Sequence, residues 1–419
     1  KDEDDDYDEQ DEKEDNENLV RSEKLEQATK LLMESAEKGY TDAQTALGQI
    51  FELREDYETA KKWYELAAAN GCLRAVNILG MFYYEGLGVP KLKEKAFALF
   101  EEASLGGDLS ASNNVAKCLE DGVGVERDIP AALELYKYSA DNGNAQAAYG
   151  YGYLLLKSVL DEKHSKKEKW IDFEKDKLRI ASLQMGIRYL HSAVEGGVAD
   201  AGFQLGKLYE HGIGVPFDLT TAYSYYFWSA SLGHGKGSLC AANMIYEQYI
   251  NSQKEKQNHY YLENNNEDDE SESTLKNHDT IPNDLNYALQ LYLQASQYGL
   301  VDGMNAYAML IEEGNGIDFN YEVSERDRMI EASKWYYAAA KSGHIEAAGN
   351  LLLLLTTYPY LKTVETIDGE HIPVDQLKMW LHSYTKKTNS KLYEALNTRE
   401  IFHENTNQTY ENELIQNNK

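Results

Sequence analysis

The sequence is poor in the residue types that mark several common classes of protein. Its 419 residues include three cysteines and six prolines, and no apolar run approaches the ~20 residues that a membrane-spanning helix needs. Cys72, Cys118 and Cys240 are too few and too scattered for a disulfide framework or a CxxC metal site, so we expect buried free thiols. The chain as given is predicted to be soluble, with no direct membrane insertion. It begins at Lys1, which leaves open a leader or membrane segment that was removed.

Positive charge is also scarce, with 41 Lys and Arg against 71 Asp and Glu and a formal net charge of −30. Nucleic acids and anionic membranes are bound largely through Lys and Arg, so both are excluded as expected partners. Residues 1 to 18 alone hold twelve Asp or Glu against two Lys. Such a composition cannot bury enough apolar surface to fold, and residues 1–25 are predicted to be an acidic disordered tail.

Signatures of catalysis are missing as well. The ten histidines show no HExxH motif and no metal-ligand spacing, and no serine lies in a G-x-S-x-G motif. We therefore predict that the chain is not an enzyme and has no catalytic residue, metal site or cofactor. His211 and His234 fall in turns between repeats, where we expect solvated or helix-capping side chains.

Glycine, by contrast, recurs at regular intervals. Eight glycines each follow a stretch of small and aromatic residues, and three of the seven spacings between them are 36 residues. Three other spacings exceed 36, which is what loop insertions into a regular array produce. The glycines are Gly39, Gly71, Gly107, Gly143, Gly197, Gly233, Gly299 and Gly343. The pattern predicts a repeat protein with eight repeats.

Three further positions keep one character across the repeats. The residue four after each glycine is small, and the residue four before it is Ala or Ser. Seven before it lies an aromatic ring in six repeats: Tyr64, Phe100, Tyr136, Tyr226, Tyr292 and Tyr336. Small residues let helix backbones approach closely, and a large ring fills the space beside them. Each repeat is therefore predicted to be a pair of helices, with Ala75, Ala147 and Ala201 buried between them.

Paired glycines occur at one place in several repeats, between the first and second helix. Examples are Gly122-Val-Gly124-Val125 and Gly212-Ile-Gly214-Val215. A phosphate-binding loop would occur once, would follow a strand, and would need Gly-Lys-Ser/Thr or a third glycine. We interpret the paired glycines instead as turns that need positive φ.

These features together resemble the Sel1-like repeat, a relative of the tetratricopeptide array. The resemblance spans about Glu26 to Leu355 and rests on repeats of ~36 residues, the small columns and the G-x-G-V turn. It implies an all-α, right-handed α-solenoid (superhelix) of about eight antiparallel helix pairs. The first repeat has Arg54-Glu55-Asp56 in place of the turn, and the eighth has Leu352 in place of a small residue. Both terminal repeats could therefore be caps.

The expected organisation follows from the extent of the array. Residues 26–355 form the solenoid, interrupted by insertions at 157–179 and 251–284. The first insertion is charged and could be an extended helix or an exposed hook, whereas the second is of low complexity and predicted to be disordered. Residues 356–419 are expected to hold one degenerate cap helix, near Val374 to Lys386, and a frayed C-terminal tail.

Binding is the function that such an array favours, and one column of residues is our candidate site. The first helices are expected to line the concave wall, with the residue six after each glycine pointing from it. The candidates for partner binding are Asn77, Asn113, Tyr149, Phe203 and Asn305. Asn is a poor helix former, and aromatic residues are enriched at interfaces. The alternative is that these side chains only pack between neighbouring repeats.

The resemblance implies a noncatalytic scaffold or adaptor whose partners are proteins, bound as an extended peptide or a helical surface. One version is the lumenal adaptor of an endoplasmic-reticulum-associated-degradation ubiquitin ligase, which recruits misfolded clients to a membrane complex; this version favours the endoplasmic reticulum lumen slightly over the cytoplasm. The alternative is a cytosolic activator that localises a membrane enzyme such as a chitin synthase. A helical-repeat hydrolase is a third version, but its cysteines at regular repeat spacing are missing here.

Overall fold

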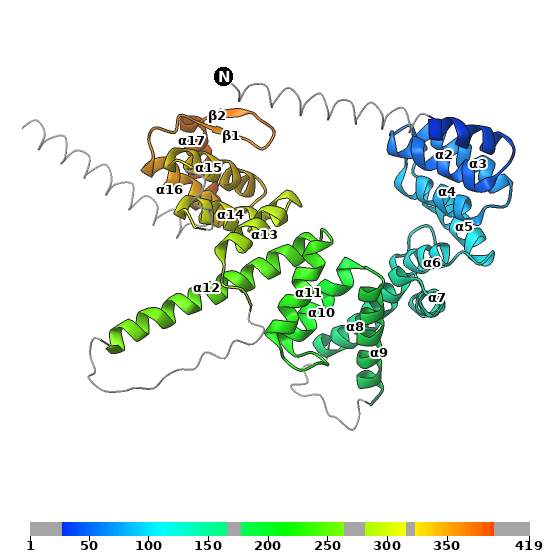
Figure 1. Cartoon of the computed structure of the whole chain (residues 1–419), viewed down its shortest axis with the longest axis horizontal. Helices are drawn as coiled ribbons and strands as arrows, with labels where there is room; N and C mark the ends of the chain where they lie inside the picture. The colour runs from blue at the N-terminus through cyan, green and yellow to red at the C-terminus, as the bar shows by residue number, and fades with distance from the viewer. Residues whose placement is uncertain (1–26, 166–176, 264–280, 316–322, 389–419) are drawn as a thin grey trace, which may run out of the picture. The chain divides into compact units, whose positions relative to one another are not determined.

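The structure is a computed structural model that describes residues 27–165, 177–263, 281–315 and 323–388 (Figure 1). Over these residues the chain consists of paired helices, and its β-structure is a single two-stranded hairpin. The prediction of an all-α fold of stacked helix pairs is confirmed. The chain divides into two compact parts, Lys1–Val198 and Ala199–Lys419, called unit 1 and unit 2 below.

Unit 1 contains four stacked helix pairs within its described residues, preceded by a helix over 27–37. The two helices of each pair pack side by side, and the second helix of a pair also contacts the first helix of the next pair. In chain order the pairs are α2 (Thr41–Leu53) with α3 (Tyr57–Ala69), α4 (Leu73–Glu85) with α5 (Lys93–Leu105), α6 (Leu109–Asp121) with α7 (Ile129–Asp141), and α8 (Ala145–Ser165) with α9 (Lys177–Glu195).

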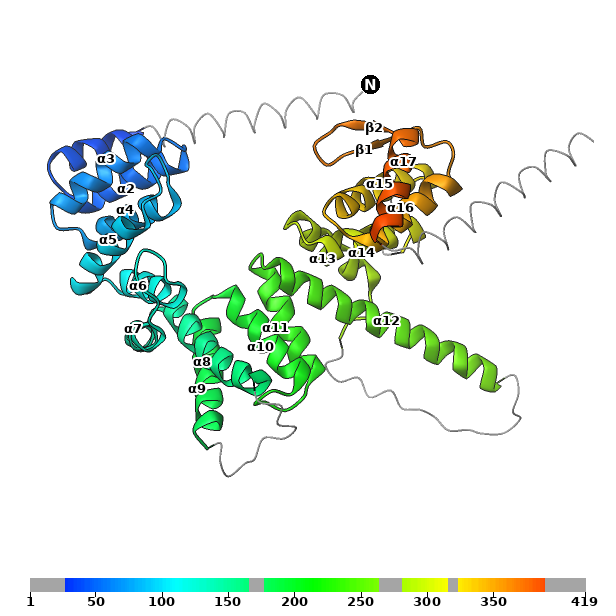
Figure 2. The ribbon, with the colours of Figure 1, turned by 180° about the vertical axis from the view of Figure 1, so that it is seen from behind.

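Unit 2 continues the same pairing and ends on a hairpin and a last helix (Figure 2). Its elements are α10 (Ala199–His211), α11 (Leu219–Ser231), α12 (Gly235–Glu263), α13 (Leu285–Gln297), α14 (Val301–Glu313), α15 (Glu325–Lys341), α16 (Ile345–Thr357), β1 (Thr363–Glu365), β2 (His371–Pro373) and α17 (Val374–Thr388). One hydrophobic core runs from Ala222 in α11 to Leu381 in α17. In unit 1 the buried side chains instead form several smaller clusters, each spread over a few neighbouring helices.

The paired glycines of the sequence form the turns between the two helices of a pair, as predicted. Gly122 and Gly124 both have positive φ, at 69° and 72°. Gly122 ends α6 in the left-handed conformation, and the N–H of Val123 bonds back to the carbonyl of Cys118. A Cβ on Gly124 would overlap the backbone carbonyl of Lys93. These glycines are therefore needed for backbone geometry. A residue with a side chain disfavours positive φ, and at Gly124 there is no room for a Cβ.

The small residues lie between helices, and the prediction that they act as spacers is confirmed. Ala75, Ala147 and Ala201 are all 0% exposed. Gly48 lies against the ring of Tyr64, to which an added Cβ would come within 2.5 Å. Large rings on second helices thus occupy the space that small residues on first helices leave open.

The buried tyrosines of the second helices share a partner that the sequence analysis did not anticipate. In four pairs the hydroxyl donates to a glutamate near the end of the first helix, at 2.5 to 3.0 Å. The pairs are Tyr64–Glu52, Tyr136–Glu120, Tyr226–Glu210 and Tyr336–Glu312. Burial raises the pKa of each of these tyrosines, so the hydroxyl stays protonated and remains a donor.

Two exceptions to this pairing change both partners together, whereas in a third the glutamate position holds Tyr246 and the hydroxyl of Tyr292 instead donates to Asn243 Oδ1 at 2.8 Å. Where the second helix carries Phe100, the glutamate position holds Tyr84, and the two rings lie 6.4 Å apart. Where the second helix carries Leu190, the same position holds Leu156, and both leucines are buried. A half-buried carboxylate therefore occurs at this position only where a hydroxyl donates to it, as the cost of burying an unpaired charge favours.

The second insertion is more helical than predicted, and the start of the first, up to Ser165, fits the predicted alternative of an extended helix. α12 continues to Glu263, so the expectation of disorder was wrong for 251–263. That stretch begins with Asn-Ser-Gln-Lys-Glu-Lys-Gln. Its Lys, Glu and Gln are good helix formers, and extending an existing helix needs no new nucleus. α8 likewise continues to Ser165, whereas Trp170 and Phe173 lie outside the described residues.

The region after the last repeat holds the predicted helix and a hairpin that was not predicted. α17 covers Val374 to Lys386 and ends at Thr388. Before it, β1 and β2 pair antiparallel through a turn in which Gly369 has a φ of 82°. Asp368-Gly369 is a typical hairpin signal, and the buried Val364 anchors β1 in the core of unit 2. The predicted tail over 1–25 and residues 389–419 lie outside the described residues. The described part of the chain begins with the helix over 27–37.

Candidate functional site

The first helices of successive pairs form a wall in each unit. In unit 1, α4 contacts α6 and α6 contacts α8, and in unit 2, α10 contacts α12. Along these helices the residues ten after each repeat glycine face outward, and Gln49, Met81 and Lys117 are exposed. This wall is the surface that we predicted from the sequence to bind partners.

An open cleft of about 670 Å³ lies on this wall in unit 1 and is centred on α4. It is called the α4 cleft below. It is lined by Gln49, Glu52, Tyr64, Arg74, Asn77, Ile78, Met81, Phe82, Glu85, Leu87, Asp108 and Ser110. The cleft is thus built mainly by the first helices of three successive repeats, with Tyr64 contributed by a second helix and Leu87 by a turn.

The charges in the α4 cleft are separated along α4. Arg74 lies in the first turn of α4, whereas Glu85 is its last residue and Glu52 lies in the last turn of α2. Glu52 accepts the hydroxyl of Tyr64 at 2.7 Å. Asp108 caps α6 by accepting the backbone N–H of Ala111 at 2.7 Å. The lining therefore carries three carboxylates against one guanidinium, with two of the carboxylates at the helix C-terminal end.

Asn77 and Asn305, two of the predicted binding residues, lie between repeats. They are only 8% and 7% exposed. The amide of Asn114 donates to Asn77 Oδ1 at 2.9 Å, and that of Asn350 donates to Asn305 Oδ1 at 3.2 Å. This arrangement fits the alternative that the column packs between neighbouring repeats. At Asn77 the amide also forms part of the lining of the α4 cleft.

The other three predicted residues are half-buried and lie on separate helices. Asn113 is on α6, Tyr149 stacks on Tyr153 within α8 at 5.8 Å between ring centroids, and Phe203 on α10 lies 4.8 Å from the ring of His234. The five predicted residues do not converge on a single site, and they are divided between the two units. Their role in binding stays a prediction.

A family model for the Sel1 repeat matches five stretches of the chain, at residues 41–72, 73–108, 109–144, 199–234 and 278–299. The chain contains Sel1 repeats. Their boundaries coincide with the helix pairs of the structure, because the first four matches each run from the start of one first helix to the start of the next. The resemblance inferred from the glycine and alanine columns is confirmed.

Three curated relatives match over much of this Sel1 repeat chain. They are chitin synthase regulator SKT5 of Saccharomyces cerevisiae (24% identical, 67% of this chain and 39% of the relative), chitin synthase regulatory factor 3 of Schizosaccharomyces pombe (23%, 70% and 30%) and chitin synthase regulatory factor 4 of the same organism (24%, 77% and 44%). The chain spans less than half the length of each of these relatives. Among solved structures, a Sel1 repeat protein from Oxalobacter formigenes is 20% identical, with a TM-score of 0.50 and coverage of 71% of this chain and 99% of that one. This likeness supports the fold alone.

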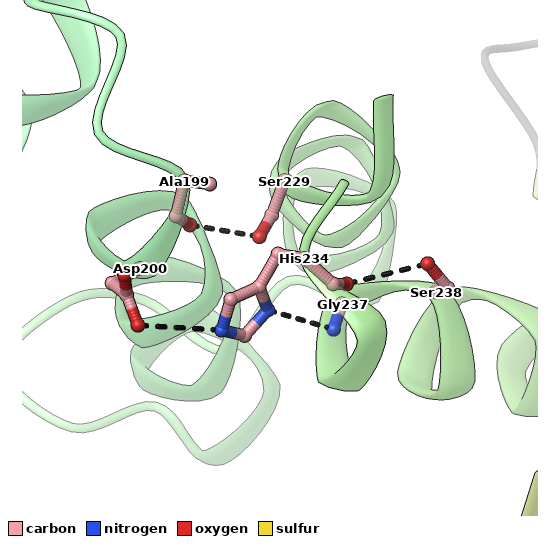
Figure 3. Close-up of polar contacts among 6 residues, drawn as sticks. All are labelled: Ala199, Asp200, Ser229, His234, Gly237 and Ser238. Atoms are coloured by element: carbon pink, nitrogen blue, oxygen red, sulfur yellow. Dashed lines mark hydrogen bonds and ion pairs between the residues drawn. The ribbon is translucent and has the colours of Figure 1, made fainter. Parts of the chain in front are cut away.

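Histidines cap two first helices among these repeats, and His234 does so as predicted. Its Nδ1 accepts the backbone N–H of Gly237 at 3.0 Å, and its Nε2 lies 3.4 Å from Asp200 (Figure 3). The hydrogen bond to His234 holds the pKa of Asp200 below its ordinary value. His344 repeats both contacts at the start of α16, with Asp302 at 3.3 Å. These contacts are structural ties between successive first helices.

No group of three or more His, Cys, Asp or Glu side chains among the described residues could hold a metal ion. All three cysteines are free; Cys118 is buried as expected, but Cys72 and Cys240 are half-buried. Burial raises the pKa of Cys118 and Cys240 to about 11, which keeps these thiols in their unreactive protonated form. None of the described helices is long and apolar enough to cross a membrane.

The residues that line the α4 cleft were mostly missed because the predicted column was offset. Arg74, Met81 and Glu85 lie three, ten and fourteen positions after Gly71 and share the outward face of α4, whereas the chosen position lies six after it. A signal was present, because positions three and fourteen after the repeat glycine are polar in nearly every repeat, and positions seven and ten lie on the same helical face.

The half-buried carboxyl of Glu312 should make the stability of unit 2 depend on pH. Burial is the main cause that raises its pKa above the ordinary value, and the hydroxyl of Tyr336 opposes that shift. The folded state then binds more protons than the unfolded state above the ordinary pKa of 4.5, so stability is lost as pH rises through the raised pKa. Glu312→Gln keeps an acceptor for Tyr336 without the charge. We expect this variant to gain stability over the parent as pH rises through that window.

Urea unfolding at a series of pH values measures this difference, and Glu346→Gln on the exposed face of α16 is the control. A Glu312→Gln variant that lost stability relative to the parent at neutral pH would show that the charged form is the favoured partner of Tyr336.

Proposed function

We propose that the chain is a noncatalytic scaffold that binds proteins through the wall of its first helices and that it regulates a chitin synthase. The observation that carries the proposal is the match to three curated relatives named as chitin synthase regulators, each over two thirds or more of this chain. The Sel1 repeats and the α4 cleft support the scaffold part, because a stack of helix pairs offers a long surface but no reaction centre among its described residues.

The relatives' names favour this version over the adaptor of an endoplasmic-reticulum ubiquitin ligase. That adaptor was the first expectation from the sequence, with the chitin synthase activator as its alternative. No feature of the described residues speaks for a ubiquitin ligase partner specifically. The identity of the partner would also indicate the compartment in which the chain works, so one experiment tests both.

Cross-linking affinity capture from the cell of origin tests the proposal. We expect chitin synthase peptides to be cross-linked to residues of the first helices. Cross-links to ubiquitin ligase subunits in place of chitin synthase would favour the adaptor version instead. Capture of neither would overturn both. A parallel assay of chitin synthase activity in membranes with and without the chain separates regulation from simple contact.

The predicted binding residues on the wall of unit 1 can be tested within the same capture experiment. Asn113 and Tyr149 are half-buried, and together they belong to two successive first helices. We expect the double variant Asn113→Ala/Tyr149→Ala to leave the thermal midpoint nearly unchanged but to reduce the capture of the partner strongly. Tyr138→Ala, which removes an exposed ring from a second helix, is the control. A large fall in the thermal midpoint of the double variant would instead make both residues part of the core.

A further inference from the structure

We propose that the α4 cleft binds a partner segment that carries a Lys or Arg side chain beside an aliphatic side chain. The inference rests on the proposed scaffold function and adds the chemistry of the segment that the cleft takes. It follows from three properties of the cleft: its apolar floor, the two glutamates at the C-terminal ends of α2 and α4, and the single guanidinium at the start of α4.

The floor of the cleft is apolar and partly open. Met81 is 37% exposed at its centre, with Ile78 and Leu87 half-buried beside it. Beneath them, Phe82 is 1% exposed and belongs to the packed core. A partly exposed methionine between half-buried aliphatic side chains gives an adaptable surface that an aliphatic side chain of a partner can cover.

The carboxylate end of the cleft favours a cation for two independent reasons. Glu52 and Glu85 lie in the last turns of α2 and α4, so they add full negative charges to the partial negative charge at those helix C-termini. Neither helix has a basic residue in its last turn, and Arg54, the C-cap of α2, is not among the residues that line the cleft. Glu52 already accepts one hydrogen bond from Tyr64, but a carboxylate has further acceptor positions. A Lys or Arg side chain of the partner would offset the negative charge at this end of the cleft and donate hydrogen bonds to the carboxylates.

The opposite end holds Arg74, which lies in the first turn of α4, where the helix dipole disfavours a cation. The side chain is exposed, and no ion pair joins it to any described residue. Eleven residues separate Arg74 from Glu85, which corresponds to about 16 Å along a helix, or about five residues of extended chain. Arg74 is thus placed to bind a carboxylate or backbone carbonyls of the same segment and to fix its direction.

Charge also argues against two other occupants of the cleft, which are a second copy of the chain and the acidic segment 1–18 of the same chain. A second copy of the chain has a net charge of −30, and residues 1–18 hold twelve carboxylates. Either would bring negative charge to a cleft whose lining is itself negative. A partner segment with a basic residue is the complementary choice.

Selection from a phage-displayed library of random 12-residue peptides against the full chain tests the inference. We expect the selected peptides to combine Lys or Arg with Leu, Ile or Met, and to carry an acidic residue about five positions from the basic one. We expect Glu85→Lys to reduce recovery of these peptides more than tenfold. Glu101→Lys, the same charge change at an exposed site on α5, should leave recovery within about twofold.

The outcomes separate this inference from the proposed function. Acidic or purely apolar peptides, no enrichment, or recovery that Glu85→Lys leaves intact would overturn the assignment of the cleft, while the capture of chitin synthase would still stand or fall by its own experiment. Self-association of the chain that Glu85→Lys abolishes would show that a second copy is the occupant. Circular dichroism of each variant confirms that recovery is compared between folded proteins.

Discussion

Replacing Tyr226 with alanine is expected to lower the free energy of unfolding of unit 2 by about 3–5 kcal/mol, the usual cost of removing a buried aromatic ring. The ring is 0% exposed, and it packs so closely on Gly206 that an added Cβ there would lie 2.6 Å from it. Truncation also removes the donor to Glu210. Hydrogen exchange of the amides of α10 and α11 measures the loss locally, since repeat proteins open in parts.

Tyr226→Phe separates the hydroxyl from the ring. The variant keeps the packing but leaves Glu210 without its donor, so we expect a smaller loss of about 1.5–3 kcal/mol, the range for hydrogen bonds to charged groups. The pair formed by α4 and α5 suggests a compensating substitution, because Phe100 lies beside Tyr84 there. Tyr226→Phe combined with Glu210→Tyr should therefore regain part of the loss. A double variant that is less stable than Tyr226→Phe would contradict the idea that the two positions change together.

Gly124→Ala is expected to destabilise the pair formed by α6 and α7 by about 2–5 kcal/mol. Gly124 has a φ of 72°, which costs an L-residue about 1–2 kcal/mol. The added Cβ would also overlap the carbonyl oxygen of Lys93, and overpacking against a backbone atom adds about 1–3 kcal/mol. The measurement is hydrogen exchange of α5, α6 and α7, where the clash and the turn meet.

Gly143→Ala is the matched control for this prediction. Gly143 also has positive φ, at 97°, but nothing lies within 4 Å of an added Cβ. Only the torsional cost of about 1–2 kcal/mol should appear. Equal losses for the two variants would mean that the close approach to Lys93 relaxes freely and that the turn glycines serve torsion angles alone.

The repeat could be predicted in detail because its signals are local. Glycines with positive φ and alanines with no exposed surface leave a fixed spacing in the sequence, and the structure places Gly122, Gly124 and Ala201 where that spacing requires. The Tyr–Glu pairs were also within reach, since a glutamate such as Glu120 or Glu210 lies thirteen residues after the repeat glycine in four of the five repeats in which tyrosine follows in the next helix. The signal was missed because each column was considered alone.

The candidate site was harder to predict because it depends on which face of a helix is outward. A shift of one position turns a helical residue by about 100°, so choosing Asn77 selected a side chain that is mostly buried in the seam between repeats and reaches only the edge of the surface, whereas Met81 and Glu85 are exposed in the cleft. The hairpin was missed for a different reason. Its strands are three residues each, and their stability comes from packing Val364 into the core of unit 2, which no local pattern reveals.

The two units bury their apolar side chains in different ways, in several small clusters in unit 1 and in one continuous core in unit 2. Each small cluster joins helices of neighbouring pairs, so one seam of unit 1 can open while the other clusters stay packed, whereas the helices from α11 onward share a single core. Under a pulling force, the described part of unit 1 would lengthen in successive steps, and the part of unit 2 from α11 onward would yield in a single event. A repeat scaffold of this kind would have an elastic part and a rigid part within one polypeptide.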